Sequence, residues 1–233
     1  MSASTGSEPR PLMPRHFEKE LQELNERVLW MASLAERAVH DSVHSALDSN
    51  ESLAQTVLEQ EGVINDMQME IDDRVVQLIA QVQPVASDLR FLLAVARINN
   101  DLERIGDQSV NIAQSAMRVL RHPRVKPYVD LPRMSELAEG MVRDSIRALI
   151  DRNIDLAQAV LIRDDQVDNL RNQIFREMLT YMMENSAVVF PAFELILMAK
   201  NLERIGDHAT NIAEDVIYIV QGRDVRHHAT DRR

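Results

Sequence analysis

The hexapeptide Leu-Glu-Arg-Ile-Gly-Asp occurs twice in this chain, at residues 102–107 and 202–207, and Asn-Ile-Ala follows each copy after a three-residue gap. A weaker similarity extends upstream at an offset of 103 residues, where Ala35-Glu36 matches Ala138-Glu139. Internal repetition at such a period makes each copy one supersecondary unit. The sequence therefore predicts two similar halves of about a hundred residues each.

The long stretches between prolines are rich in good helix formers and poor in aromatic residues, which predicts an all-α fold. Apolar residues recur at alternating steps of three and four from Phe91 to Val119 and again from Leu195 to Ile219, as in antiparallel helical bundles. Pro84 is expected to end one helix, with Ser87 as the N-cap of the next. We expect two tandem three-helix bundles, with helices at 15–47, 52–82, 87–120, 132–150, 155–183 and 191–220.

Four segments follow from this organisation. Residues 1–14 contain Ser, Gly and Pro but no apolar run, and are expected to form a disordered arm and not a signal peptide. The first bundle is predicted at 15–121 and the second at 132–221, separated by a segment with two prolines. A short basic tail is expected at 222–233.

Composition restricts the class of protein. No apolar run approaches the roughly 20 residues that span a bilayer, and we expect a cytoplasmic protein. A net charge of −11 disfavours general nucleic-acid binding, which needs a basic surface. The absence of cysteine excludes disulfides and thiolate metal sites.

Glu103 and Asp107 are four residues apart and therefore share one helix face, away from the apolar stripe. Two like charges at this spacing, with Gly106 between them, oppose helix formation by about 1 kcal/mol or more. The same unfavourable combination recurs in the second copy. Because both copies keep it, we expect a compensating partner such as a cation.

A helical hairpin brings together residues that are equally far from its turn. A turn at Pro84 sets two polar residues of the second helix level with the first motif, and a turn at Asn185–Ser186 does the same for the second motif. The first patch is defined as Glu61, Asn65, Glu103 and Asp107, and the second patch as Asp164, Asp168, Glu203 and Asp207.

Carboxylate and amide oxygens suit hard cations such as Mg²⁺, Mn²⁺ or iron. The second patch is the stronger candidate, because Asn65 replaces one carboxylate in the first. A solvated acidic face, with Arg104 and Arg204 as local charge partners, is the alternative. His208 is the one nearby nitrogen ligand.

His40 and His44 also have the i, i+4 spacing of metal ligands on a helix. The second copy has Arg143 and Arg147 at these positions, which cannot bind a metal. This substitution predicts that the two histidines are exposed to solvent and hold no metal.

The two hexapeptides, together with Gln-Pro-Val-Ala-Ser-Asp-Leu-Arg at 83–90 and Leu-Thr-Tyr-Met-Met-Glu at 179–184, resemble the PhoU family of phosphate-transport regulators over residues 17–226. The resemblance implies two three-helix bundles, each binding several metal ions through a pair of Glu/Asp-x-x-x-Asp motifs. On this chain those motifs are the first and second patches. The metal implied is Mg, Mn, Fe or Zn, and Asn65 departs from the acidic pattern.

The resemblance further implies a regulator without catalytic residues that represses the phosphate-starvation response and limits phosphate uptake. Its implied partners are the ATPase of a phosphate ABC transporter and a phosphate-sensing histidine kinase, and a homodimer is expected. Two alternatives stay open. One is a metal-free helical scaffold. The other is a di-iron carboxylate oxidase, although that class requires Glu-x-x-His motifs, which this chain does not contain.

Overall fold

Six long helices and one short 3-10 helix account for most of the residues that the structure describes. The computed structural model describes residues 15–126, 129–223 and 225, and this part of the chain contains no strand. The predicted all-α fold and its six helices are confirmed. The helices are α1 (Arg15–Leu47), α2 (Glu51–Val82), α3 (Ala86–Val119), α4 (Asp130–Asp151), α5 (Ile154–Glu184) and α6 (Val189–Gln221), with η1 (Ser186–Val188) before α6.

The turn between the first two helices of each half is built twice from the same backbone pattern. Ser49 has φ 55° and Arg152, its counterpart 103 residues later, has φ 49°. The next residue caps the following helix in both halves, because the Asn50 and Asn153 side chains accept hydrogen bonds from helix N–H groups at 3.1 and 3.0 Å. The repeat therefore extends to turn conformation and helix capping.

Pro84 separates α2 from α3 as predicted. Gln83 is the C-cap of α2 with φ 49°, and Val85 is the N-cap of α3 without a side-chain hydrogen bond. The expectation that Ser87 caps α3 is wrong. Since the helix already begins at Ala86, Ser87 lies inside its first turn and cannot occupy the cap position.

The turn predicted at Asn185–Ser186 is confirmed. Helix α5 ends at Glu184, and the Asn185 side chain accepts a hydrogen bond from the Ala187 N–H at 3.0 Å. Pro191 lies in the first turn of α6, where the backbone N–H has no helical partner to lose. Both hairpins therefore turn where the level placement of the patches requires.

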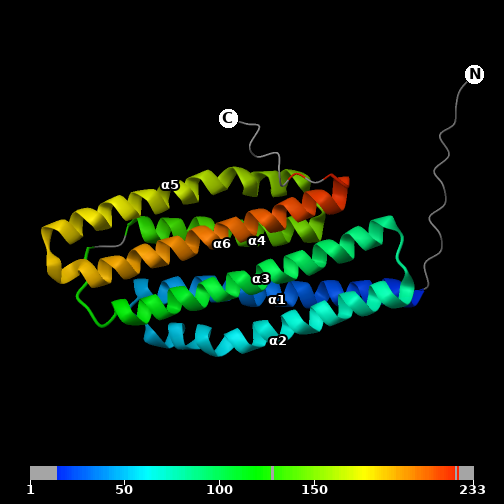
Figure 1. Cartoon of the computed structure of the whole chain (residues 1–233), viewed down its shortest axis with the longest axis horizontal. Coiled ribbons are helices and arrows are strands. Elements are labelled where there is room, and N and C mark those ends of the chain that lie inside the picture. The colour runs from blue at the N-terminus through cyan, green and yellow to red at the C-terminus, as the bar shows by residue number, and fades with distance from the viewer. Residues whose placement is uncertain (1–14, 127–128, 224, 226–233) are drawn as a thin grey trace, which may run out of the picture.

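The helices form two three-helix layers lying against each other along their length (Figure 1). Helices α1, α2 and α3 pack together, as do α4, α5 and α6, and the halves meet through α3 against α6 and α1 against α4. The predicted apolar stripes are buried, including Leu102 and Ile105 in α3 and Leu202 and Ile205 in α6. One hydrophobic cluster contains residues from all six helices, so the two halves share a core.

The arm predicted at 1–14 and nearly all of the tail predicted at 222–233 lie outside the described residues. Within the described part, no helix is both long enough and apolar enough to cross a membrane.

Candidate metal-binding patches

The second patch comes from adjacent faces of α5 and α6. Asp164 lies against the backbone of Gly206, where an added Cβ would be 3.6 Å from Asp164 Oδ1. Burial, followed by the negative charges of Asp207 and Asp168, raises the pKa of Asp164 to about 6. The pKa of Asp207 is also raised, first by removal from water and then by Glu203 and Asp168. All four carboxyl groups therefore act on one another, as the hairpin register predicted.

Arg171 supplies the local countercharge of the second patch. Its guanidinium donates to Glu203 Oε1 at 3.4 Å and lies 4.0 Å from Asp168 Oδ1. Sequence reasoning did not identify this residue, although its position three residues after Asp168 on the same helix was a usable signal. Four carboxylates with one nearby arginine still leave net negative charge, and they offer oxygen ligands to a hard cation.

The first patch shows the same helix register with fewer direct contacts. A Cβ added to Gly106 would lie 3.1 Å from Ile64 Cδ1, so α2 meets α3 between Glu61 and Asn65. Burial and then the Asp107 charge raise the pKa of Glu103, whose side chain is 15% exposed.

Arg104 is the countercharge of the first patch. Its guanidinium nitrogens lie 3.4 Å from both Glu103 Oε2 and Asp107 Oδ2. Arg104 thus has the contacts that the alternative of a solvated acidic face predicts for it. In the first patch, the two carboxylates of α3 therefore share one arginine and lie next to the segment of α2 that carries Glu61 and Asn65.

His208, the one nitrogen ligand considered for the second patch, makes its hydrogen bond elsewhere. Its Nδ1 lies 2.8 Å from Asp101 Oδ1 of α3, and the Asn211 side chain donates to the same oxygen at 3.1 Å. The imidazole thus joins the two halves. Its positive form would lower the pKa of both Glu103 and Asp207. Since His208 follows Asp207 directly and Asp101 precedes Glu103 by two residues, this contact brings the two motifs near the same level of the bundle.

Among the described residues, one group of three ligating side chains has its ligand atoms all within 4.8 Å of one another, and it belongs to neither patch. It consists of His40, His44 and Glu139. The carboxylates of the patches are more widely spaced, so side-chain rotation would have to accompany cation binding. Metal binding by the patches stays a prediction.

These observations define a class: tandem-repeat helical proteins in which each three-helix half carries a Glu-x-x-x-Asp motif on its third helix. A model of the PhoU domain matches the chain twice, at residues 28–116 and 131–216. The chain belongs to the PhoU family.

Similar proteins cover nearly the whole chain. The phosphate-specific transport system accessory protein PhoU homolog of Clostridium acetobutylicum is 37% identical over 210 residues, covering 90% of this chain and 96% of that protein. The homolog from Pseudomonas putida is 38% identical, covering 91% and 84%. The crystal structure of PhoU from Pseudomonas aeruginosa is 37% identical with a TM-score of 0.85, covering 89% of this chain and all of that one.

Proposed function

We propose that this protein is a regulator of a phosphate-specific transport system that restrains phosphate uptake when phosphate is sufficient. Family membership over both halves carries this proposal, because the similar proteins are named as accessory proteins of that system. The role is regulatory and needs no catalytic residue. In this role the protein acts in the cytoplasm, in contact with the transporter ATPase and a sensor histidine kinase.

The patches are the proposed metal-binding part of this regulator. The chemistry of the second patch supports a hard cation, because burial and then the repulsion of neighbouring carboxylates raise the pKa of Asp164 to about 6. A bound divalent cation would offset that repulsion and favour the ionised form. In the first patch, Glu61, Glu103 and Asp107 with Asn65 would supply a less acidic set of the same ligands.

A metal-free docking face is the second candidate, and the arginines favour it. Arg104 and Arg171 already contact carboxylates in the first and second patch, as they would on a solvated acidic surface. In that case the patches would bind a basic surface of the partner directly.

Homodimer formation is also part of the proposal. Sedimentation velocity of the full chain measures whether the protein is a dimer in solution.

The regulatory role is tested by deleting the gene in its own host. We expect phosphate-starvation genes to stay expressed in rich phosphate, and the wild-type chain to restore repression. Normal repression in the deletion strain would refute the proposed function.

The metal role is tested separately by elemental analysis of protein purified without chelator or affinity tag. We expect the Glu203→Ala, Asp207→Ala variant to lose about half of the bound metal and to restore repression poorly. The charge-matched control is Glu136→Ala, Glu184→Ala, which removes two exposed carboxylates from α4 and α5. Wild type without metal after incubation with Mn²⁺, Fe²⁺ or Mg²⁺ would leave the docking face as the explanation.

A further inference from the structure

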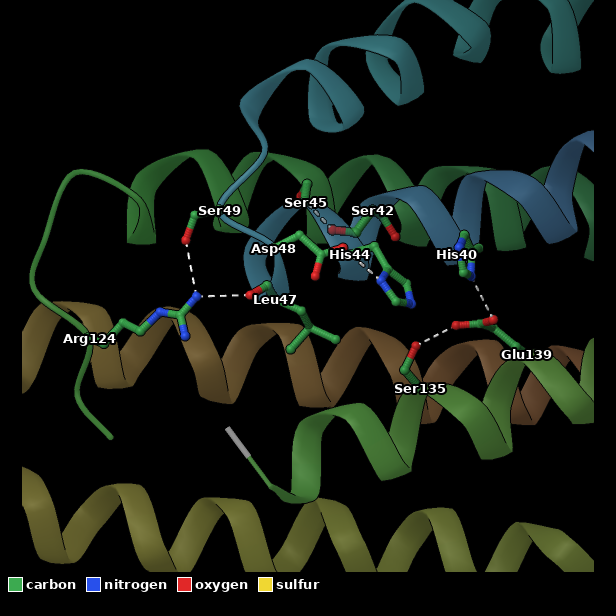
Figure 2. A network of polar contacts seen from close by, with 10 residues as sticks. All are labelled: His40, Ser42, His44, Ser45, Leu47, Asp48, Ser49, Arg124, Ser135 and Glu139. Atoms are coloured by element: carbon green, nitrogen blue, oxygen red, sulfur yellow. Dashed lines mark hydrogen bonds and ion pairs between the residues drawn. The ribbon is translucent and has the colours of Figure 1, made fainter. Parts of the chain in front are cut away.

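His40 and His44 of α1 face Glu139 of α4 at the junction between the two halves (Figure 2). His40 Nδ1 lies 3.1 Å from Glu139 Oε2, and the two imidazole rings are 4.1 Å apart between centroids. One ligand atom from each of the three residues lies within 4.8 Å of the others. The expected exposure holds for His40, whose side chain is 52% exposed, whereas His44 is only partly exposed, at 35%. The side chain of Glu139 is 17% exposed.

Hydrogen bonds from neighbouring residues orient these side chains, as is usual for residues that bind a metal. Asp48 Oδ2 lies 3.0 Å from Nδ1 of His44, which leaves Nε2 of that ring as its free ligand atom. The Ser135 hydroxyl donates to Glu139 Oε1 at 2.6 Å, which fixes the carboxylate. Orienting partners of this kind set the tautomer of a ligating histidine and the direction of a ligating carboxylate.

The repeat supplies an internal comparison, because the same positions occur again 103 residues later. There Arg143 lies 3.8 Å from Glu36, and Arg147 lies 3.8 Å from Asp151. These ion pairs are the counterparts of the two histidine contacts. Arginine stays protonated and has no lone pair for a metal, so the second half keeps the contacts without the ligands.

We propose that His40, His44 and Glu139 form a zinc-class site that joins α1 to α4, in addition to the two acidic patches and independently of the proposed function. Two imidazoles and one carboxylate are a ligand set that zinc uses, with a water in the fourth position. Ligand atoms around tetrahedral zinc are about 3.4 Å apart, since each bond is about 2.1 Å long. The three groups reach this spacing by small rotations of their side chains. Bound metal cross-links the two halves.

The test is a titration of the full chain with Zn²⁺, monitored by calorimetry and by NMR of the histidine ring nitrogens. We expect one zinc to shift the ring nitrogens of His40 and His44. Zinc bound only at the acidic patches would leave both rings unchanged and overturn the proposal. The Glu203→Ala, Asp207→Ala variant, which weakens the second patch, should keep these shifts.

The matched variant is His40→Arg, His44→Arg, which copies the second half and keeps a cation opposite Glu139. It should fold normally and lose Zn²⁺ affinity by more than the roughly 10–100-fold that follows loss of an orienting partner. At 100 times the dissociation constant of this site, Zn²⁺ should raise the Tm of wild type by about 5–10 °C more than it raises the Tm of this variant. Equal zinc affinity in the two proteins would refute the site.

The converse variant, Arg143→His, Arg147→His, installs the same ligands opposite Glu36. If the shared scaffold is what holds the ligands, this protein gains a second zinc equivalent with its own shifted ring nitrogens. A variant that folds but gains none would contradict the argument from the repeat.

Discussion

At the scale of single residues, the Asp164 carboxyl carries a charge where the fold disfavours one. Burial and then the other three carboxylates of the second patch raise its pKa to about 6. The folded protein therefore binds a proton that the unfolded chain has released between about pH 4 and pH 6. Stability is lost as pH rises through this window, because the ionised carboxyl is disfavoured only in the folded state.

Replacing Asp164 by Asn should reverse this loss in the absence of metal. We expect Asp164→Asn in EDTA to be more stable than wild type at pH 7.5 by on the order of 1 kcal/mol, after allowance for solvent screening. The difference should shrink by pH 4.5, where wild type is already protonated. Urea unfolding at the two pH values measures it, with Glu136→Gln as the control. A constant difference at both pH values would contradict the assignment.

The carboxylates of the second patch could be predicted from sequence because they depend only on helix periodicity and one turn position. Two other features could not. The contact of Arg171 with Glu203 depends on side-chain rotamers, which spacing does not determine. The contact of His40 with Glu139 joins residues of different halves, so it depends on how α1 packs against α4. The arginines of the second copy pointed away from a ligand role, although Arg143 makes the same kind of inter-half contact with Glu36.

At the scale of helices, the two glycines of the repeated motif have different surroundings. A Cβ on Gly106 would lie 3.1 Å from Ile64 Cδ1, tighter than ordinary contact, so α2 approaches α3 closely there. On Gly206 the nearest atoms would be 3.6 Å away, at ordinary van der Waals distance. A packing contact tighter than ordinary van der Waals distance is therefore found only at the glycine of the first half.

Alanine substitutions should separate helix propensity from packing. Gly206→Ala should stabilise the protein by up to about 1 kcal/mol, the propensity difference in a helix interior. Gly106→Ala should gain less or destabilise, because Ile64 must move. Adding Ile64→Val removes the Cδ1 atom and should benefit the Gly106→Ala background more than wild type. Thermal unfolding of the single and double variants measures the coupling, and equal effects of both alanines would contradict the packing difference.

An ion pair between α3 and α6 restricts how far the two helices can shift along each other. Arg118 donates to both oxygens of Glu194, at 2.7 and 2.9 Å, and the Glu194 side chain is 5% exposed. We expect Arg118→Met to destabilise the protein by about 2 kcal/mol or more, because a buried carboxylate loses its partner. The double variant with Glu194→Met should recover much of the loss. Urea unfolding of the wild type, both single variants and the double variant measures the coupling energy of the pair. Additive changes in the free energy of unfolding would indicate that the pair contributes little.

At the scale of the whole molecule, the repeat predicted two halves, and the structure places both around one core. The hydrophobic cluster takes buried residues from all six helices, including Val28 and Ile64 in the first half and Met141 and Leu202 in the second. Sequence could not show this, because an apolar stripe indicates that a helix face is buried without indicating which partner buries it. Helices α3 and α6 use their stripes within their own halves and against each other.

A shared core should make the halves unfold together, and the single tryptophan allows a test. Trp30 lies on α1 and reports the first half, whereas far-UV circular dichroism reports all helices. Leu202 is fully buried in α6, so Leu202→Ala should cost about 2–5 kcal/mol. If the core is cooperative, this change in the second half lowers the urea midpoint of Trp30 fluorescence as much as that of circular dichroism. An unshifted fluorescence midpoint beside a two-step dichroism curve would mean that the halves fold independently.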